Sequence, residues 1–479
     1  MLFNSIEFAI FFLLVFILYW FVTGKKYKIQ NILLLVASYY FYGCWDWRVL
    51  FLLIFSTTLD YFSGLMMADA SGKKIKRFWF WTSIIVNLGF LGVFKYYNFF
   101  IDSFADALSS VGVQSNFSSL QVILPVGISF YTFHGLSYVI DIYNDRIKPE
   151  RNFIHYSVFV CFFPLLVAGP IERATHLLPQ ITKERVFDYN KAVDGLRQIL
   201  WGLFKKIVIA DNCATVVNRI FDNYHTQSAS NLVLGAVLFA FQIYGDFSGY
   251  SDIALGTARL LGIELLRNFG FPYFSRDIAE FWRRWHISLT TWFRDYLYIP
   301  LGGSRGSKGM AIRNTFIIFL VSGFWHGANW TFIVWGAFHA LLFMPLLILG
   351  RNRKNTNSVA EGKFLPTGKE FFQMATTFML VVLGWIFFRA PSLTVAFHYL
   401  FSIFSFSIFT IPTLKITTLI IFILLFMLVE WVQREKKHGL AQFEMLIKPR
   451  YIRWPVYILL ILIIIQFGGK SETFIYFQF

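Results

Sequence analysis

The chain has few charged residues and almost no cysteine. Charged side chains make up 15% of its 479 residues, whereas a soluble globular domain carries roughly 25%. The three cysteines, Cys44, Cys161 and Cys213, include no CxxC pair, which argues against a disulfide framework and a cysteine metal site. No stretch is polar enough and long enough to form an independent soluble domain.

Two familiar catalytic motifs are also absent. The sequence contains no HExxH, the pair of zinc ligands on one helix face, and no GxxxxGK[ST] loop for nucleotide phosphates. These absences argue against a zinc hydrolase and an ATPase. Spacing alone leaves haem ligation by His326 and His339 open, but we expect no bound metal and no bound cofactor.

Apolar residues dominate what is present. They make up 57% of the chain, including 59 phenylalanines, and the mean hydropathy is +0.57. A membrane-spanning helix needs about 20 predominantly apolar residues. The sequence therefore predicts an all-α, polytopic integral membrane protein with about 11–13 spans and one transmembrane domain over 1–479. The candidate spans are 6–23, 31–45, 48–67, 78–94, 121–142, 153–170, 230–256, 312–328, 330–350, 372–390, 413–432 and 452–467.

Four regions mix aromatic and charged residues and predict interfacial or re-entrant helices. They are 95–118, 185–225, 264–305 and 392–411. The formal net charge of +16 comes from short basic loops beside apolar spans. Such loops favour the cytoplasmic side and contact anionic lipid headgroups, so they require no nucleic-acid partner. This topology places the aromatic tail, 468–479, outside the cytoplasm.

Two histidines lie in apolar, aromatic sequence. His286 follows FWRRW, and His326 lies in SGFWHGANWTF. An ionisable side chain at membrane depth is energetically unfavourable, so such residues are candidates for function by default. The 3–4 spacing of tryptophans predicts one continuous helix from Trp282 to Tyr296, with His286 beside its polar face.

Three arginines near His286 suggest an anion site. Arg283, Arg284 and Arg294 could hold a phosphate, because guanidinium forks match its oxygens. The alternative is an interfacial helix whose arginines extend to the membrane surface above an aromatic belt. That alternative accounts for the arginines and tryptophans better than it accounts for His286.

His326 has small neighbours that would let a backbone or a slender substrate approach closely. Its imidazole has a suitable pKa to accept a proton from a hydroxyl nucleophile, with Trp325 and Asn329 as candidate substrate-binding neighbours. The alternative is an ordinary interhelical hydrogen bond. We assign that ordinary role to His134 and His339.

Two carboxylates, Asp246 and Asp252, lie in YGDFSGYSD. One interpretation is a broken helix that lines a cavity, with Asp246 binding substrate. The other is that the glycines allow close helix packing and the aspartates pair with nearby arginines. The sequence favours neither.

These segments resemble the membrane-bound O-acyltransferase family. The resemblance rests on WHGANWTF around His326, RRWHISLTTWFRDYLYIPLGG around His286, and LVAGPIER at 166–173, and it is closest to the branch that acts on bacterial polysaccharides such as alginate and peptidoglycan. It implies a ring of helices around a central tunnel. It also implies that His326 is the catalytic histidine and that His286 is a second essential polar residue.

The C-terminal sequence, FIYFQF, resembles the FIYFxF ending of the small membrane partner in teichoic acid D-alanylation, where a tyrosine is implicated as an acyl relay. Carried over, Tyr476 is that residue, and a tyrosine hydroxyl is a legitimate covalent nucleophile when a base activates it. The alternative is an aromatic anchor at the outer interface.

The resemblance predicts an O-acyltransferase of the bacterial inner (cytoplasmic) membrane. It implies acetyl-CoA as the cytoplasmic donor, an extracytoplasmic polysaccharide as the acceptor, and a hydrolase-like acetyltransferase as an extracytoplasmic partner. Two other classes remain open on the residues alone. One is a transporter or flippase for a lipid-linked sugar with a histidine proton relay, and the other is a scaffold in a polysaccharide-export complex.

Overall fold

The computed structural model describes residues 1–114, 117–120, 124–167, 169–468 and 472–477. All regular secondary structure in these ranges is helical, which confirms the all-α class. Ala168 of the LVAGPIER segment, parts of the candidate spans 121–142 and 153–170, and positions 469–471 and 478–479 of the aromatic tail lie outside the described residues.

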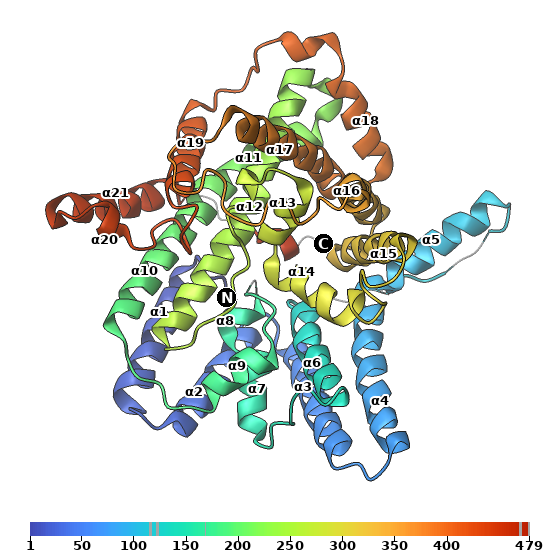
Figure 1. Cartoon of the computed structure of the whole chain (residues 1–479), viewed down its shortest axis with the longest axis vertical. Helices are drawn as coiled ribbons and strands as arrows, with labels where there is room; N and C mark the ends of the chain where they lie inside the picture. The colour runs from blue at the N-terminus through green and yellow to red at the C-terminus, as the bar shows by residue number, and fades with distance from the viewer. Residues whose placement is uncertain (115–116, 121–123, 168, 469–471, 478–479) are drawn as a thin grey trace. The chain divides into compact units, whose positions relative to one another are not determined.

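The chain divides into two compact units, and Figure 1 labels most of their helices. The first unit comprises residues 1–188 and 258–266. Its helices are α1 (Ile6–Ile17), η1 (Leu18–Val22), α2 (Tyr27–Gly43), α3 (Trp47–Ala68), α4 (Lys73–Leu91), η2 (Gly92–Tyr96), α5 (Tyr97–Ser110), α6 (Ile128–Tyr143), α7 (Phe153–Cys161), α8 (Phe163–Leu166) and α9 (Ala174–Ile181).

The second unit comprises residues 189–257 and 267–479. Its first helices are α10 (Tyr189–Leu203), η3 (Phe204–Ala210), α11 (Asp211–Asp222), η4 (Tyr224–Thr226), α12 (Ala229–Leu260), η5 (Pro272–Phe274), α13 (Ile278–Arg284), α14 (Ile287–Phe293) and η6 (Arg294–Tyr298). The remainder are α15 (Lys308–His326), α16 (Trp330–Ile348), α17 (Gly368–Arg389), α18 (Leu393–Ile403), η7 (Phe406–Phe409), α19 (Thr417–Val432), α20 (Phe443–Leu446), α21 (Arg450–Phe467) and η8 (Ile475–Phe477). The prediction of one domain over 1–479 stays a prediction.

Six helical segments of the described chain are long and apolar enough to cross a membrane. They are Trp47–Ala68, Lys73–Ser110, Ala229–Leu260, Trp330–Ile348, Gly368–Arg389 and Arg450–Phe467. Three shorter apolar helical segments are Ile6–Val22, Leu393–Ile403 and Thr417–Val432. These helices confirm a multi-pass membrane protein, whereas the total of 11–13 spans and the central tunnel stay predictions.

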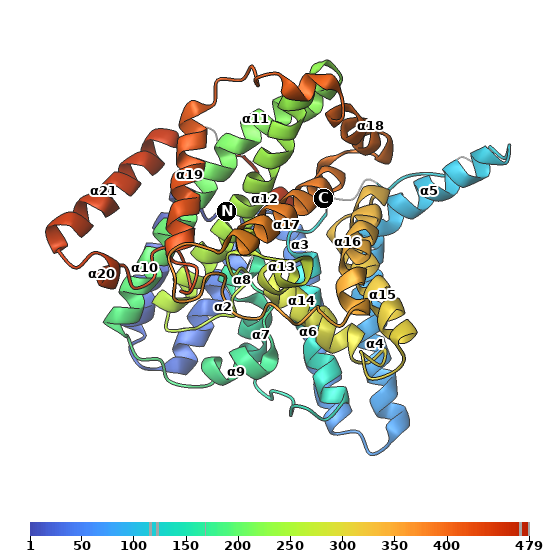
Figure 2. The same cartoon turned by 45° about the horizontal axis from the view of Figure 1, so that its top comes forward.

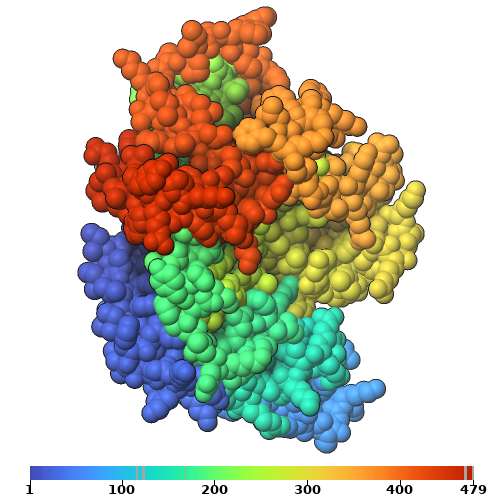
Figure 3. All heavy atoms as spheres, turned by 60° about the vertical axis from the view of Figure 1, so that its left-hand side comes forward, coloured from blue at the N-terminus to red at the C-terminus, as the bar shows by residue number. Residues whose placement is uncertain are grey.

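The spans of the second unit differ in how many of their residues are buried. In the most apolar 18-residue stretch of α12, 83% of the residues are buried, but in that of α21 only 6% are. Figure 3 shows the C-terminal helices, in red, at the molecular surface. Large apolar side chains such as Trp454, Leu459 and Ile465 cover the outside of α21. Such a surface suits contact with lipid tails.

Helix α12 is continuous over 32 residues. A Cβ atom added at Gly249 would lie 2.8 Å from the carbonyl oxygen of Gly202, and one added at Gly245 would lie 2.9 Å from that of Lys205. The broken-helix interpretation is therefore wrong. The glycines instead bring α12 against α10 and η3, because only a residue without a side chain permits this approach.

Helices α15 and α16 lie side by side (Figures 1 and 2). A Cβ atom at Gly323 would lie 2.2 Å from the carbonyl oxygen of Phe332, and one at Gly336 would lie 2.3 Å from that of Phe319. This close crossing fixes the end of α15, and therefore the position of His326, against α16.

Buried polar contacts connect parts of the first unit. The Glu172 side chain accepts hydrogen bonds from the backbone N–H of Leu266 and from Nδ1 of His176, the latter at 2.8 Å. This hydrogen bond to Glu172 raises the pKa of His176, and burial opposes it. His134 also makes a structural hydrogen bond, since its Nε2 accepts the Glu172 backbone N–H at 3.0 Å, but its partner lies in the loop before α9 and not in a second helix as predicted.

Candidate functional site

His286 lies at a break between α13 and α14. Its backbone is left-handed, with φ 43° and ψ 55°, a conformation that costs an L-residue about 1–2 kcal/mol. The predicted continuous helix from Trp282 to Tyr296 is therefore wrong. Strained backbone of this kind is found at functional sites more often than elsewhere.

Backbone hydrogen bonds to a neighbouring loop stabilise the break. The N–H of Ile287 donates to the carbonyl of Asn268 at 2.8 Å, and the N–H of Gly270 donates to the carbonyl of Arg284 at 2.8 Å. These contacts replace helical hydrogen bonds that a continuous helix would have made. Tryptophan spacing carries no information about such a long-range pairing.

The His286 ring is 1% exposed and lies among aromatic rings. The centroid of its imidazole is 4.7 Å from that of Phe247, with the two planes nearly perpendicular, and 6.0 Å from that of Trp325. Phe247 comes from α12 and Trp325 from α15, so three segments meet at this histidine.

His326 is the last residue of α15 and is 4% exposed. Its imidazole contacts the rings of Trp325, Trp335 and Phe388, with centroid distances of 5.0, 5.2 and 5.3 Å. The next residue, Gly327, leaves room for the ring of Phe332, because an added Cβ atom would lie 2.1 Å from it.

Tyr476 in the C-terminal tail contacts the surroundings of both histidines. Its ring centroid is 5.6 Å from that of His326, 4.7 Å from that of Phe247 and 6.5 Å from that of Trp325. Phe247 therefore lies between Tyr476 and His286, contacting both rings at 4.7 Å. The three predicted catalytic residues, which are far apart in sequence, form one cluster.

A buried ion cluster holds the tail in this position. The Lys206 ammonium lies 2.7 Å from a carboxylate oxygen of Asp246 and 2.7 Å from one of Asp211. Lys206 also donates to the carbonyl of Glu472 at 2.9 Å, while the backbone N–H of Ile475 donates to Asp246 at 2.6 Å. Each tail contact lies within four residues of Tyr476.

Asp246 therefore has a different partner from the arginine that the sequence suggested. It pairs with Lys206, a residue that the sequence reasoning missed. The available signal was a lysine pair at 205–206 inside the apolar stretch LWGLFKKIVIA, because a buried cation in apolar sequence requires a partner. In this arrangement Asp246 contacts the tail backbone instead of lining an open substrate cavity.

The three predicted anion-binding arginines have separate protein partners. Arg283 donates to the carbonyls of Asn352 and Asn355, at 2.7 and 2.6 Å. Arg284 pairs with Glu280 at 2.7 Å, and Arg294 pairs with Asp295 at 2.7 Å. The structure assigns the three to different contacts and not to one shared anion site.

The side chain of Asn329 caps a helix, whereas the ring of His339 packs among aromatic rings. The Asn329 side chain caps α16 by accepting the Thr331 N–H at 3.0 Å and donates to the carbonyl of Pro391 at 3.0 Å. His339 is 0% exposed, and neither of its ring nitrogens has a hydrogen-bond partner in the described part of the chain. The interhelical hydrogen bond predicted for His339 is thus wrong, and aromatic packing takes its place.

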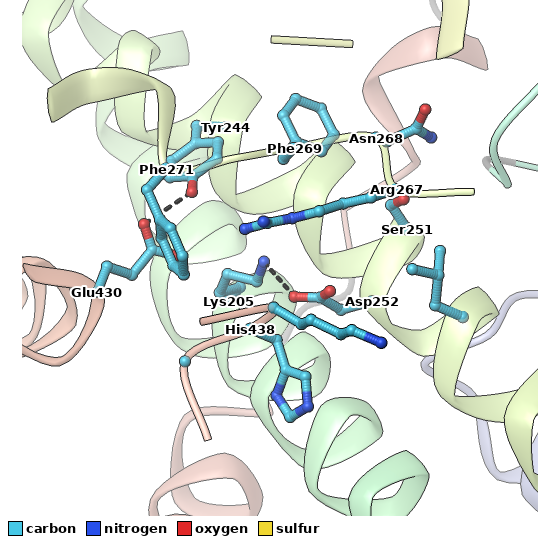
Figure 4. Close-up of a pocket in the computed structure, with 13 residues that line it drawn as sticks. Lys205, Tyr244, Ser251, Asp252, Arg267, Asn268, Phe269, Phe271, Glu430 and His438 are labelled. Atoms are coloured by element: carbon cyan, nitrogen blue, oxygen red, sulfur yellow. Dashed lines mark hydrogen bonds and ion pairs between the residues drawn. The ribbon is translucent and has the colours of Figure 1, made fainter. Parts of the chain in front are cut away.

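A pocket lies within the second unit (Figure 4), and one of its lining residues is Asn268, whose carbonyl accepts the N–H of Ile287. Its volume is about 20 Å³, which is room for about one water molecule. Lys205 pairs with Asp252 at 2.6 Å, and the Tyr244 hydroxyl donates to Glu430 at 2.7 Å. The side chain of Arg267 extends across it (Figure 4). No group of three or more potential metal ligands occurs in the described ranges.

Comparison with known proteins places this chain in a family. The profile of MBOAT, the membrane-bound O-acyltransferase family, matches residues 145–384. The chain is 41% identical over 409 residues to the probable alginate O-acetylase AlgI of Pseudomonas aeruginosa, covering 85% of this chain and 75% of that protein. The chain belongs to the membrane-bound O-acyltransferase family.

Two further relatives differ in the polymer they are named for. The peptidoglycan O-acetyltransferase of Helicobacter pylori is 35% identical over 83% of this chain and 78% of that protein. The teichoic acid D-alanyltransferase of Bacillus subtilis is 30% identical over 45% of this chain and 57% of that protein. This O-acyltransferase is a multi-pass membrane enzyme, and nothing in these comparisons supports the transporter alternative.

Proposed function

We propose that this enzyme transfers an acetyl group from a cytoplasmic thioester, acetyl-CoA, to hydroxyl groups of an extracytoplasmic polysaccharide. The support is the family membership together with relatives named for O-acetylation of alginate and peptidoglycan. We further propose that the chain lies in the cytoplasmic membrane of a bacterium and delivers the acetyl group to a separate hydrolase-like acetyltransferase outside.

The observation that carries the mechanism is the contact between His326 and Tyr476, whose ring centroids are 5.6 Å apart. His326 acts as the general base and removes the proton from the Tyr476 hydroxyl. The phenolic oxygen attacks the thioester carbonyl, a C–O bond forms, the C–S bond breaks, and the CoA thiolate takes up the proton from His326.

A second transfer regenerates the enzyme. A hydroxyl of the acceptor or of the partner gives its proton to His326 and attacks the acetyl-tyrosine carbonyl. The ester bond to Tyr476 breaks, and the phenolate recovers the proton. His286, held by its break in the helix, orients the acyl group. The aromatic enclosure supports both steps by excluding water and by holding the reactants in place.

Trapping the intermediate tests this mechanism. Purified wild-type protein, incubated with acetyl-CoA and no acceptor, is expected to gain one acetyl group on Tyr476, detected by mass spectrometry of the C-terminal peptide. Tyr476→Phe should gain none. An enzyme that transfers acetyl groups at the normal rate without ever carrying one on Tyr476 would reject the relay and leave direct transfer to the acceptor.

A further inference from the structure

Asn268 contacts the chain directly after the break at His286. It lies in the loop that follows α12 and is 1% exposed. Its carbonyl accepts the N–H of Ile287 at 2.8 Å, and its side-chain oxygen accepts the hydroxyl of Ser288 at 2.6 Å. These partners are the first two residues of α14. One residue from another segment therefore bonds to both residues that follow His286.

The same loop also contacts the chain before the break. The N–H of Gly270 donates to the carbonyl of Arg284 at 2.8 Å. The ring centroid of Phe269 lies 5.1 Å from that of Trp285, with the two planes nearly perpendicular. The loop therefore holds the backbone on both sides of His286. A left-handed residue between two such contacts has little freedom to relax toward an ordinary backbone conformation.

The carbonyl of Asn268 replaces a cap that His286 does not provide. His286 is the residue before α14, a position from which a side chain often bonds to N–H groups of the first turn. Its ring makes no such capping hydrogen bond. Because Asn268 bonds to the first of these N–H groups from outside the helix, the imidazole can pack against the rings of Phe247 and Trp325 instead.

Stability alone does not explain an asparagine at position 268. Its amide nitrogen has no hydrogen-bond partner in the described part of the chain, and a buried donor without an acceptor is destabilising. A leucine, which is similar in size, would avoid this penalty and would keep the backbone bond to Ile287. It would lose only the bond to Ser288. That bond is therefore the property by which asparagine differs from leucine here.

We propose that Asn268 is a positioning residue of the acyl-transfer reaction and that it acts through His286. Its hydrogen bond to Ser288 fixes the first turn of α14, and this turn fixes the direction of the imidazole that precedes it. The inference rests on the proposed function, because it takes His286 to orient the acyl group. A small rotation of the ring misplaces that group, and misplacement slows the chemical step without weakening the binding of the donor.

Two substitutions of similar size separate the hydrogen bond from packing. Asn268→Leu removes the acceptor, whereas Asn268→Asp keeps an acceptor oxygen for Ser288. For the full-length enzyme in nanodiscs, Asn268→Leu should lower kcat for acetyl transfer about 10- to 100-fold and leave the KM for acetyl-CoA unchanged. Asn268→Asp should restore most of the lost kcat. Ser288→Ala, which removes the other partner of the bond, should lower kcat as Asn268→Leu does.

Combined variants distinguish positioning from a general structural role. Asn268→Leu should cause no further loss of kcat in a Ser288→Ala or a His286→Ala background, because the group through which it acts is already removed. Losses that multiply would overturn the inference, as would an unchanged kcat or a raised KM in Asn268→Leu.

The matched control is Asn231→Leu. Asn231 is also buried in the second unit, and its side chain bonds to Thr413. This variant should lower the melting temperature and leave kcat per folded enzyme unchanged. If Asn268→Leu fails to fold, Ser288→Ala provides the same comparison.

The failure of this inference can be told apart from the failure of the proposed function. Normal transfer by His286→Ala would reject the orienting role of His286 in the proposed function. Slow transfer by His286→Ala, together with normal transfer by both Asn268→Leu and Ser288→Ala, would reject the positioning role of Asn268 alone.

Discussion

The ring of Tyr476 packs against the ring of His326, with their centroids 5.6 Å apart and their planes inclined by 49°. One residue ends a helix and the other lies in the C-terminal tail. Because both are held by separate contacts, the glycine crossing of α15 and the Lys206 cluster, the pair is a defined feature of the fold. It suits a base and a nucleophile that act on one substrate.

Replacing His326 by Gln should reduce acetyl transfer about 10²- to 10⁴-fold, the usual contribution of a general base. The matched control is His339→Gln. His339 is also buried, and its ring centroid lies 5.0 Å from that of Trp335, compared with 5.2 Å for His326. Transfer and thermal unfolding of both variants should be measured together. Similar loss of activity in both would assign a packing role to His326.

Replacing Tyr476 by Phe should abolish polymer acetylation with little change in the melting temperature, because the ring and its contacts remain. Acetylation of the polymer in cells is the measurement, with the isolated protein's unfolding curve as the control. Normal acetylation by Tyr476→Phe would exclude a required acyl-tyrosine.

Replacing Asp246 by Ala should slow transfer about tenfold or more, because the Ile475 N–H loses its acceptor and the tail is released. Asp211→Ala is the matched control, since Asp211 also pairs with Lys206 at 2.7 Å, whereas the backbone N–H of Ile475 donates to Asp246. Proteolysis of the tail and transfer rate should change together in Asp246→Ala. Equal effects in the two variants would contradict a positioning role.

Replacing Gly323 by Ala should destabilise the protein by about 1–3 kcal/mol, because the new methyl group would collide with the Phe332 carbonyl of α16. Gly309→Ala, in the first turn of the same helix, meets only the Ser307 hydroxyl at 3.8 Å and should be nearly neutral. Thermal unfolding in detergent checks both variants. No difference between them would show that the crossing tolerates a side chain.

His176 should stabilise the protein more in acid than in base. The hydrogen bond to Glu172 raises the pKa of His176. The stabilisation is therefore fully present below the ordinary histidine value of about 6.5. It is lost as the pH rises through the raised value of the folded state. The melting temperature of His176→Gln should fall further below wild type at about pH 5.5 than at about pH 9. The reverse order would contradict the ion pair.

The sequence by itself determined the class of the protein. A chain that is 57% hydrophobic and 15% charged has too few polar side chains to cover the surface of a soluble domain of this size. In lipid, a helix lets each apolar segment form all its backbone hydrogen bonds internally. The sequence also indicated two histidines as candidates for function. An ionisable side chain in apolar sequence is energetically unfavourable unless it has a functional role or a polar partner.

Only the tertiary structure decided how the site is built. The break at His286 depends on hydrogen bonds to residues 268–270, which helical periodicity cannot report. The position of Tyr476 depends on Lys206 and Asp246, which pair across a long stretch of sequence. Local sequence patterns report short-range geometry, whereas these two features arise from contacts between distant segments.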